Sequence, residues 1–177
     1  MRRVTFGGAN SLDNFVARSD GAVDWLKWSK EVAEIGNAFW KTVDTVVIGR
    51  KTYDAGLKLG TSSFPGVKNY LVSRTLTKSE SPNIELVGED AVDFVRRLKS
   101  ESGKGICIMS GGNLARSLLE ADLIDEIGIN IHPLLLGHGV PLFYEMSRQI
   151  ELKLIECKEL KNGCAVLRYE VKHEKAL

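Results

Sequence analysis

Two short segments of the sequence combine glycine with side chains that can bind an anion. Segment 49–52 reads Gly-Arg-Lys-Thr directly after the apolar run TVVI, and segment 110–112 reads Ser-Gly-Gly directly after ICIM. Glycine at a helix start lets a ligand approach the backbone closely, and the free N–H groups and dipole of a helix N-terminus favour phosphate. We therefore predict that Gly49, Gly111 and Gly112 border a phosphate-bearing ligand.

The side chains near these glycines strengthen this prediction. Arg50 and Lys51 place two cations where the helix dipole opposes them by roughly 0.3–1 kcal/mol, which a bound anion would offset. Thr52 can donate its hydroxyl to a phosphate oxygen, and Ser73 and Arg74 add a hydroxyl and a cation at the end of another apolar run. The alternatives are a solvated basic first turn at 50–52 and a packing turn at the glycine pair. Three polar strand ends favour an extended ligand such as a dinucleotide.

The sequence does not contain the fingerprint of a Rossmann dinucleotide-binding fold. That fold needs G-x-G-x-x-G after its first strand and an acidic residue about 20 positions later. Neither GGANSLD near the start nor SGGNLAR later matches this pattern. Because no acidic residue is placed to read the ribose while Arg50, Lys51 and Arg74 are available, we predict NADP rather than NAD.

The elements that must position these residues alternate between strands and helices. Unbroken apolar runs at 45–49 and 106–109 indicate strands covered on both faces, and further strands are expected at 69–73, 83–88 and before Pro133. Near the C-terminus, two alternating runs flank Lys-Asn-Gly at 161–163, a strong hairpin signal. We therefore predict an α/β fold with a mixed, mainly parallel sheet and a C-terminal antiparallel hairpin.

Three helices are expected from apolar periodicity. Apolar residues from Trp25 to Phe39 recur every three or four positions, and Asp24 is the expected N-cap of this helix. Core packing is the expected role of Trp28 and Phe39, and lining of a substrate cleft is the alternative. The segments 91–101 and 113–121 have the same periodicity, so each should cover a face of the sheet.

The overall composition is that of one ordinary globular domain spanning residues 1–177. The net charge of +1 gives no basic field for nucleic acid, and the apolar runs are too short to cross a bilayer. The N-terminus does not read as a signal peptide. The three cysteines and the His132–His138 pair match no metal spacing, so we expect no metal site, free thiols and a cytoplasmic protein.

Taken together, several motifs resemble the dihydrofolate reductase superfamily. They are VVIGRKTY, NYLVSRT, the run from IMSGGNLARSLL to GVPLF, and LRYEV, in this order over nearly the whole chain. The sequence is most similar to the branch that contains the reductase domain of riboflavin biosynthesis, whose S-L-D-G-x-x-A loop resembles SLDNFVA here. The resemblance implies a three-layer α/β/α fold, bound NADPH, hydride transfer to a small heterocyclic or sugar-imine substrate, and homodimers in many members.

The resemblance also assigns residues. It places Gly49 to Thr52 at the adenosine 2′-phosphate and pyrophosphate, with Ser73 and Arg74 along the adenosine. It places four residues of the second segment at the pyrophosphate: Gly111, Gly112, Asn113 and Leu114. The nicotinamide would be bordered by Ala9, Val16 and Ala17.

The sequence departs from the family pattern in ways that bear on the substrate. Riboflavin-pathway reductases commonly have a glutamate where Ser110 stands, so the substrate 5-amino-6-(5-phosphoribosylamino)uracil is one candidate among several. The zinc deaminase motifs that often precede this reductase are absent. Dihydrofolate reduction is the weaker alternative, because the register gives Ala33 where those enzymes have a carboxylate, and no Pro-Trp occurs.

The identity of the proton donor stays open at this point. Reduction of a C=N bond needs a proton, for which Asp13 is the first candidate and Glu31 the second; an ordered water is the alternative. Asp13 could instead cap its own loop, and Glu31 could be solvated. A protein that lacks a proton donor would be a non-catalytic NADP- or phosphometabolite-binding protein on the same fold.

Overall fold

A computed structural model describes residues 1–173 of the chain. Its centre is an eight-stranded sheet with the order β5-β4-β3-β6-β1-β7-β10-β9. The first six strands of this order are parallel, whereas β10 runs antiparallel to both of its neighbours. The strands are β1 (Val4–Ser11), β3 (Val43–Gly49), β4 (Lys68–Val72), β5 (Ile84–Val87), β6 (Gly105–Met109), β7 (Glu126–His132), β9 (Leu152–Glu159) and β10 (Ala165–Val171).

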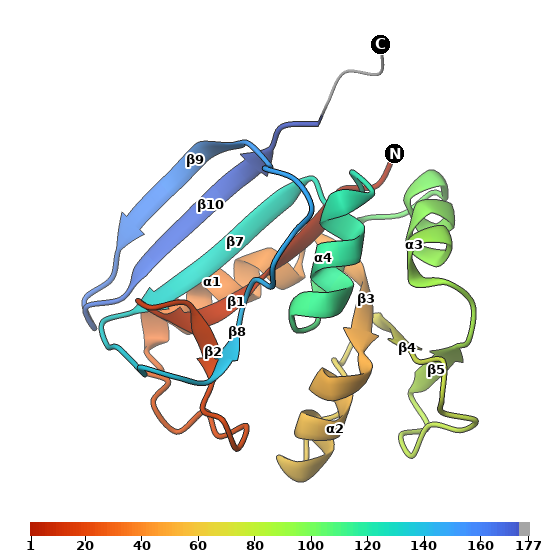
Figure 1. Cartoon of the computed structure of the whole chain (residues 1–177), viewed down its shortest axis with the longest axis horizontal. Helices are drawn as coiled ribbons and strands as arrows, with labels where there is room; N and C mark the ends of the chain where they lie inside the picture. Colours follow the sequence, from red (N-terminus) through yellow and green to blue (C-terminus); the bar gives the residue numbers. More distant parts are fainter. Residues whose placement is uncertain (174–177) are drawn as a thin grey trace.

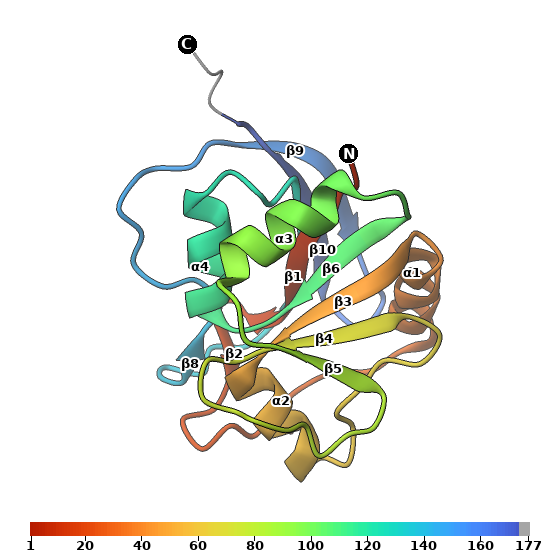
Figure 2. The same ribbon diagram turned by 90° about the vertical axis from the view of Figure 1, so that its right-hand side faces the viewer.

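Within residues 1–173 four helices pack on this sheet, two on each face, as Figures 1 and 2 show. They are α1 (Lys30–Trp40), α2 (Arg50–Lys58), α3 (Ala91–Ser100) and α4 (Gly112–Glu120). One apolar cluster joins α3 and α4 to side chains such as Phe6 and Ile108, and a second joins α1 and α2 to side chains such as Val46 and Ile48. The expected fold, with its mainly parallel sheet, three layers and antiparallel hairpin, is therefore confirmed.

A second, small sheet lies beside the carboxyl end of β1. It pairs β2 (Phe15–Ala17) with β8 (Val140–Pro141) in antiparallel fashion. The backbone N–H of Leu142 also donates to the carbonyl of Asn14 at 3.0 Å. This pairing fixes the loop after β1 against the segment that follows β7.

The predicted start of the first helix is wrong. The helix α1 begins at Lys30, and its N-cap is Ser29, whose side chain accepts a hydrogen bond from the N–H of Val32. Asp24 instead forms an ion pair with Arg18 at 2.7 Å.

The tryptophans before this helix also differ from expectation. Trp25 is buried against the ring of His132, with the ring centroids 5.2 Å apart. Trp28, expected in the core, is 78% exposed, whereas Phe39 does pack against the second apolar cluster. Across residues 1–173, no helix has the length and apolar character that crossing a membrane requires.

Candidate functional site

The two glycine segments of the sequence lie side by side at the carboxyl edge of the parallel strands. Strands β3 and β6 are neighbours in the sheet, and Ile48 is paired with Met109. Both α2 and α4 start at this edge, on opposite faces of the sheet (Figure 2). In parallel α/β sheets, ligands bind outside the carboxyl ends of the strands.

Gly49 allows the two glycine segments to lie this close together, because no larger residue fits at its position. A Cβ atom there would lie 2.1 Å from Oγ of Ser110 and 3.8 Å from a methyl group of Leu114. The φ of Gly49 is −81°, so the need for glycine comes from contact with the second segment and not from backbone conformation. The predicted convergence of the two segments is therefore present in the fold.

The helices that start at this site differ from the other two in their capping. Ser29 and Asp90 cap α1 and α3 by accepting hydrogen bonds from backbone N–H groups. The N-caps of α2 and α4 are Gly49 and Gly111, and neither helix has a side-chain cap. Because the first N–H groups of a helix have no partner inside the helix, two adjacent sets of donors face the same edge. This arrangement fits a diphosphate group.

Cationic side chains surround these donors. The guanidinium of Arg50 contacts Asp54 through Nε at 2.7 Å, which leaves both of its Nη groups without a partner among the described residues. Lys51 and Arg74 are exposed, and neither forms an ion pair within residues 1–173. Three cations therefore lie where the sequence predicts anionic groups of the ligand.

Ser73 and Thr52 have different surroundings. Ser73 is buried, and its hydroxyl accepts hydrogen bonds from the N–H groups of Thr75 and Leu76, so it stabilises the turn after β4. Thr52 is half-buried in the first turn of α2. On this side Arg74 is thus more accessible than its serine neighbour.

The glycine pair before α4 contains two unlike positions. A Cβ on Gly111 would have no atom within 4 Å, whereas a Cβ on Gly112 would lie 1.4 Å from the ring of Tyr144. Asn113, the next residue, is exposed. Gly112 therefore accommodates an aromatic side chain from a distant segment, and Gly111 leaves open space at the edge. Sequence reasoning missed Tyr144, for which the local pattern has no signal.

The residues expected at the nicotinamide lie next to each other in space. Ala9 is half-buried on β1, and Val16 on β2 packs against the main core. Ala17 is buried, and its carbonyl oxygen approaches Gly139 so closely that a Cβ there would lie 2.2 Å away. Strand β2 lies against β1, which brings these three small or apolar side chains near the carboxyl end of β1.

Asp13 connects two loops at this end of the sheet. Its carboxylate accepts hydrogen bonds from Oγ of Ser11 at 2.5 Å and from the N–H groups of Leu136 and Gly137 at 3.1 and 2.7 Å. The Ser11 hydroxyl, with these backbone donors, lowers the pKa of Asp13. The contacts favour the loop-capping role over the role of proton donor, since an acid must be protonated to donate.

Glu31, on α1, contacts the C-terminal hairpin. Its carboxylate accepts a hydrogen bond from the N–H of Lys161 at 3.1 Å and forms an ion pair with Lys158 at 3.2 Å. The Lys161 N–H and the Lys158 side chain lower the pKa of Glu31. A structural role in fixing α1 to the hairpin accounts for these contacts.

A buried polar group beside Ala9 was not foreseen from the sequence. The N–H of Lys27 donates to Nδ1 of His132, and burial lowers the pKa of this histidine. On the other side of the ring, Nε2 lies 3.3 Å from Nδ2 of Asn130. Oδ1 of Asn130 has no partner among the described residues, and Asn130 is paired with Ala9 in the sheet. Asn10, one position on, has an unpartnered amide oxygen as well.

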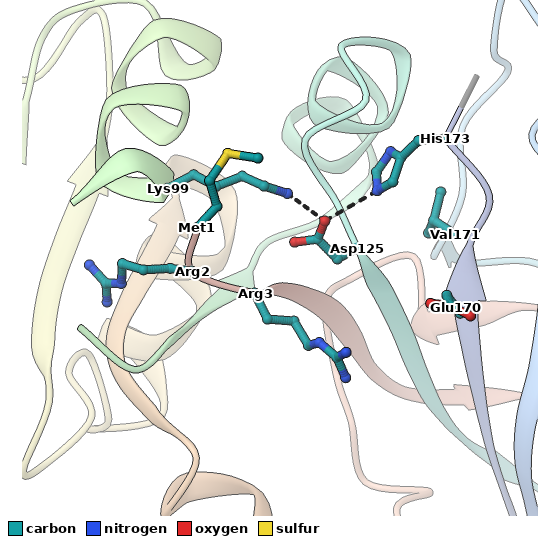
Figure 3. A pocket seen from close by; sticks show the side chains of 8 residues that line it. All are labelled: Met1, Arg2, Arg3, Lys99, Asp125, Glu170, Val171 and His173. Atoms are coloured by element: carbon teal, nitrogen blue, oxygen red, sulfur yellow. Dashed lines mark hydrogen bonds and ion pairs between the residues drawn. The ribbon is translucent and has the colours of Figure 1, made fainter. Parts of the chain in front are cut away.

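A pocket of about 230 Å³ opens at the opposite, amino edge of the sheet (Figure 3). Its charged side chains are paired within the protein: Asp125 accepts from Lys99 and lies 3.1 Å from Nε2 of His173. Arg3 is likewise paired with Glu126. This pocket contains none of the residues that the sequence singles out.

Comparison with known proteins identifies the family. The family model of the RibD C-terminal domain matches residues 2–166. This chain belongs to the RibD C-terminal domain family. The uncharacterized protein YwjB of Bacillus subtilis is 35% identical over 161 residues, which cover 89% of this chain and 92% of YwjB.

Solved structures agree with membership of the RibD C-terminal family. A protein from Shewanella sp. PV-4, described as a riboflavin biosynthesis protein, has a TM-score of 0.84 and 29% identity over 98% of this chain and all of its own. A deaminase/5-amino-6-(5-phosphoribosylamino)uracil reductase from Thermotoga maritima has a TM-score of 0.72 and 13% identity, covering 97% of this chain and 57% of its own. Dihydrofolate reductase from Enterococcus faecalis, solved with NADP(H), has a TM-score of 0.68 and 12% identity and covers 97% of each chain. The last two likenesses show the fold.

Proposed function

We propose that this RibD-type domain is an NADPH-dependent reductase that transfers hydride to a small heterocyclic or sugar-imine substrate. The observation that carries the proposal is the pair of neighbouring helix starts, at Gly49 and Gly111, that lack side-chain caps and face one edge of the sheet. Bound there, NADPH would supply the hydride. The chain itself would hold the diphosphate, the 2′-phosphate and the nicotinamide.

Different residues would bind different parts of NADPH, according to their charge and size. Arg50, Lys51 and Thr52 would hold the 2′-phosphate and part of the diphosphate, with Ser73 and Arg74 along the adenosine. Each charge-assisted contact contributes about 1.5–3 kcal/mol. The second segment would add the N–H groups of Gly112, Asn113 and Leu114, and the nicotinamide would lie against Ala9, Val16 and Ala17. Such an apolar wall excludes water from the reacting atoms.

The contacts of Asp13 and Glu31 indicate whether either carboxylate could supply the proton that the substrate needs. Hydride addition to a C=N bond leaves a nitrogen that must gain a proton. Because Asp13 and Glu31 are both engaged in structural hydrogen bonds, we propose that an ordered water delivers this proton.

Ser110 bears on the identity of the substrate. Its hydroxyl donates to the carbonyl of Gly111 at 3.1 Å and carries no charge. Where the riboflavin-pathway pattern has a carboxylate facing the substrate, this chain therefore offers a neutral side chain. We propose a substrate of the same chemical class as 5-amino-6-(5-phosphoribosylamino)uracil, without the group that a carboxylate would bind.

Titration with NADPH and NADH, followed by tryptophan fluorescence and by thermal melting, tests the cofactor site. We expect NADPH to bind and raise the melting temperature, and NADH to do so much more weakly. Oxidation of NADPH is then followed with the ribosylaminouracil phosphate, with dihydrofolate and with small cyclic imines. No response to either nucleotide at millimolar concentration would refute the proposal.

The structural hydrogen bonds of Asp13 and Glu31 also favour a second function. A protein with this fold that binds NADP or a phosphometabolite without turnover would need no proton donor. Tight binding of NADPH without oxidation on any of these substrates would support this alternative over the reductase.

A further inference from the structure

One side of α4 faces the segment that connects β8 to β9. This side carries Gly112, Arg116 and Glu120, which are spaced four positions apart and therefore lie in one row along the helix. The connecting segment runs beside α4 in both views of the fold (Figures 1 and 2). At one end of the row its Tyr144 packs on Gly112. At the other end the N–H and hydroxyl of its Ser147 donate to Glu120 at 2.8 and 2.9 Å. Arg116 lies between these two contacts.

Arg116 is a cation without a hydrogen-bond partner. Its side chain is half-buried, and its Nε is fully buried without forming a hydrogen bond. No nitrogen of this guanidinium forms a hydrogen bond or an ion pair with any of residues 1–173. Glu120 lies one turn away, but its pKa is lowered first by the hydrogen bonds from Ser147 and to a smaller extent by the charge of Arg116. A buried donor without a partner destabilises the folded protein.

The guanidinium of Arg116 also lies near the wrong end of its helix. The side chain of a helical residue leans toward the helix N-terminus, so Arg116 covers the turn that begins at Gly112, about 5.4 Å along the axis. This turn has free backbone N–H groups and no side-chain cap. A cation here is opposed by the positive end of the helix dipole. Donors and positive charge thus meet at this turn without an acceptor among the described residues.

Tyr144 brings a further donor to the same turn. Its ring lies so close to Gly112 that a Cβ there would be 1.4 Å from a ring carbon, whereas the space beside Gly111 is open. The side chain is half-buried, and its hydroxyl forms no hydrogen bond within residues 1–173. The neighbouring Phe143 packs edge-on against Phe6, with the ring centroids 5.7 Å apart. The position of Tyr144 is therefore fixed by packing.

We propose that Arg116 and Tyr144 bind a phosphate group at the start of α4, and that this group belongs to the diphosphate of NADPH. This inference rests on the proposed function. A guanidinium can donate two parallel hydrogen bonds to phosphate, and the hydroxyl of Tyr144 would donate to a further oxygen. The anion would give each unpartnered donor an acceptor and would offset the opposition between Arg116 and the helix dipole.

The surroundings favour a diphosphate over a single phosphate. Gly49, at the uncapped start of α2, contacts Ser110, which directly precedes Gly111. A second phosphate could therefore be bound by α2 at the same edge of the sheet. Arg116 and Tyr144 would then determine how tightly the half of the diphosphate at α4 is held.

Titration of two variants with NADPH, inorganic pyrophosphate and orthophosphate tests the proposal. Arg116→Met keeps an apolar stem but removes the guanidinium, and should weaken binding of NADPH and of pyrophosphate by roughly ten- to a hundredfold. Tyr144→Phe keeps the ring and should weaken both by roughly threefold or more. The matched controls are Arg96→Met, at an exposed arginine of α3 that is paired with Asp93, and Tyr169→Phe on β10. Both controls should keep the affinities of the wild type.

Thermal melting of the ligand-free variants separates binding from a structural role. Because Arg116 has no partner, Arg116→Met should melt at the same temperature as the wild type or higher while its affinity falls. A lower melting temperature with unchanged affinity for NADPH would mean that Arg116 only supports the fold, and would overturn this proposal while leaving the reductase proposal intact.

The three ligands separate the phosphate site from the cofactor. We expect orthophosphate to bind much more weakly than pyrophosphate. Equal affinities for the two, or phosphate binding that depends on Arg116 without any binding of NADPH, would overturn the assignment to the diphosphate of NADPH. If the wild type binds none of the three ligands, both this proposal and the proposed function are refuted.

Discussion

Gly49 and Ser110 are in direct contact although 61 positions separate them in the chain, and a Cβ on Gly49 would lie 2.1 Å from Oγ of Ser110. This contact joins the ends of two neighbouring strands at the point where two helices begin. The distance between the two uncapped helix starts is therefore fixed by packing, before any ligand binds. A site assembled in this way loses little ordering entropy on binding.

Substitution of Gly49 by Ala tests this contact. The added methyl group forces Ser110 to move, and overpacking of this kind costs about 1–3 kcal/mol of unfolding free energy. Ser110→Gly removes the atoms that clash, so the double variant should regain most of the loss. Urea unfolding of the two single variants and the double variant measures the coupling. Equal losses in Gly49→Ala with and without Ser110→Gly would contradict the contact.

The neighbouring glycines before α4 should respond in opposite ways to alanine. Gly112→Ala places a methyl group 1.4 Å from the ring of Tyr144 and should lower the unfolding free energy by about 1–3 kcal/mol. Gly111→Ala has open space around it and φ of −76°, so the effect on stability should be within about 1 kcal/mol. Thermal melting of both variants checks the difference. The proposed function adds that Gly111→Ala weakens NADPH binding.

Charge at the start of α2 should determine the preference between nucleotides. Loss of one charge-assisted contact of about 1.5–3 kcal/mol corresponds to roughly a 10- to 100-fold weaker affinity. We therefore expect Arg50→Ala and Lys51→Ala to weaken NADPH binding by this factor and NADH binding less, because NADH has the diphosphate but no 2′-phosphate. Fluorescence titration measures both constants.

Lys58, the last residue of the same helix, is the matched control. Lys58→Ala removes an equal charge from α2 and should leave the affinity for NADPH unchanged. If all three variants lose affinity equally, the effect is one of net charge and the assigned phosphate contacts are wrong.

Replacement of Asp13 by Asn should change both stability and its pH dependence. The pKa of Asp13 is below its ordinary value of 3.8, so ionised Asp13 stabilises the fold above that pH. The contribution is lost as the pH falls through the lowered pKa. Asp13→Asn should therefore be less stable than the wild type at neutral pH, and the two should converge below about pH 4.

Turnover of the same variant separates the two roles of Asp13. With a loop-capping role, Asp13→Asn keeps measurable NADPH oxidation, because the carboxylate transfers no proton. A loss of kcat of more than about 100-fold in a folded variant with unchanged NADPH affinity would restore the role of proton donor.

Most of the strands could be predicted from local sequence patterns. The run TVVIG forms β3 and ICIM forms most of β6, because strands covered on both faces need apolar side chains at every position. The Asn-Gly turn at 162–163 joins β9 to β10 as expected. The convergence of Gly49 and Gly111 followed from the same patterns, since parallel strands end at one edge.

The error at α1 has a specific physical cause. Trp25 and Trp28 continue the helical periodicity of Val32 and Ile35, but Trp25 is buried by His132, a residue more than 100 positions away. The side chain of Ser29, not that of Asp24, caps the helix. Periodicity within a window cannot distinguish a helical turn from a loop whose side chains are buried by a distant strand.

Local sequence patterns also could not predict which distant residues contact the site residues. Asp13 was a plausible turn residue from its neighbours, but the N–H groups it binds belong to Leu136 and Gly137 on another loop. Tyr144 reaches Gly112 across 32 positions. The sequence therefore predicts which strand ends form the site, and tertiary packing decides which side chains remain free within it.

The paired charges at Asp125 occupy the edge of the sheet where β1 begins and β10 finishes. Because β10 runs antiparallel to β1, β1 starts and β10 ends at this edge, whereas α2 and α4 start at the other (Figure 1). Attachment to a bead or a sensor chip through the N-terminus should thus leave the proposed nucleotide-binding edge unobstructed. Immobilised protein would then be a convenient format for screening candidate substrates.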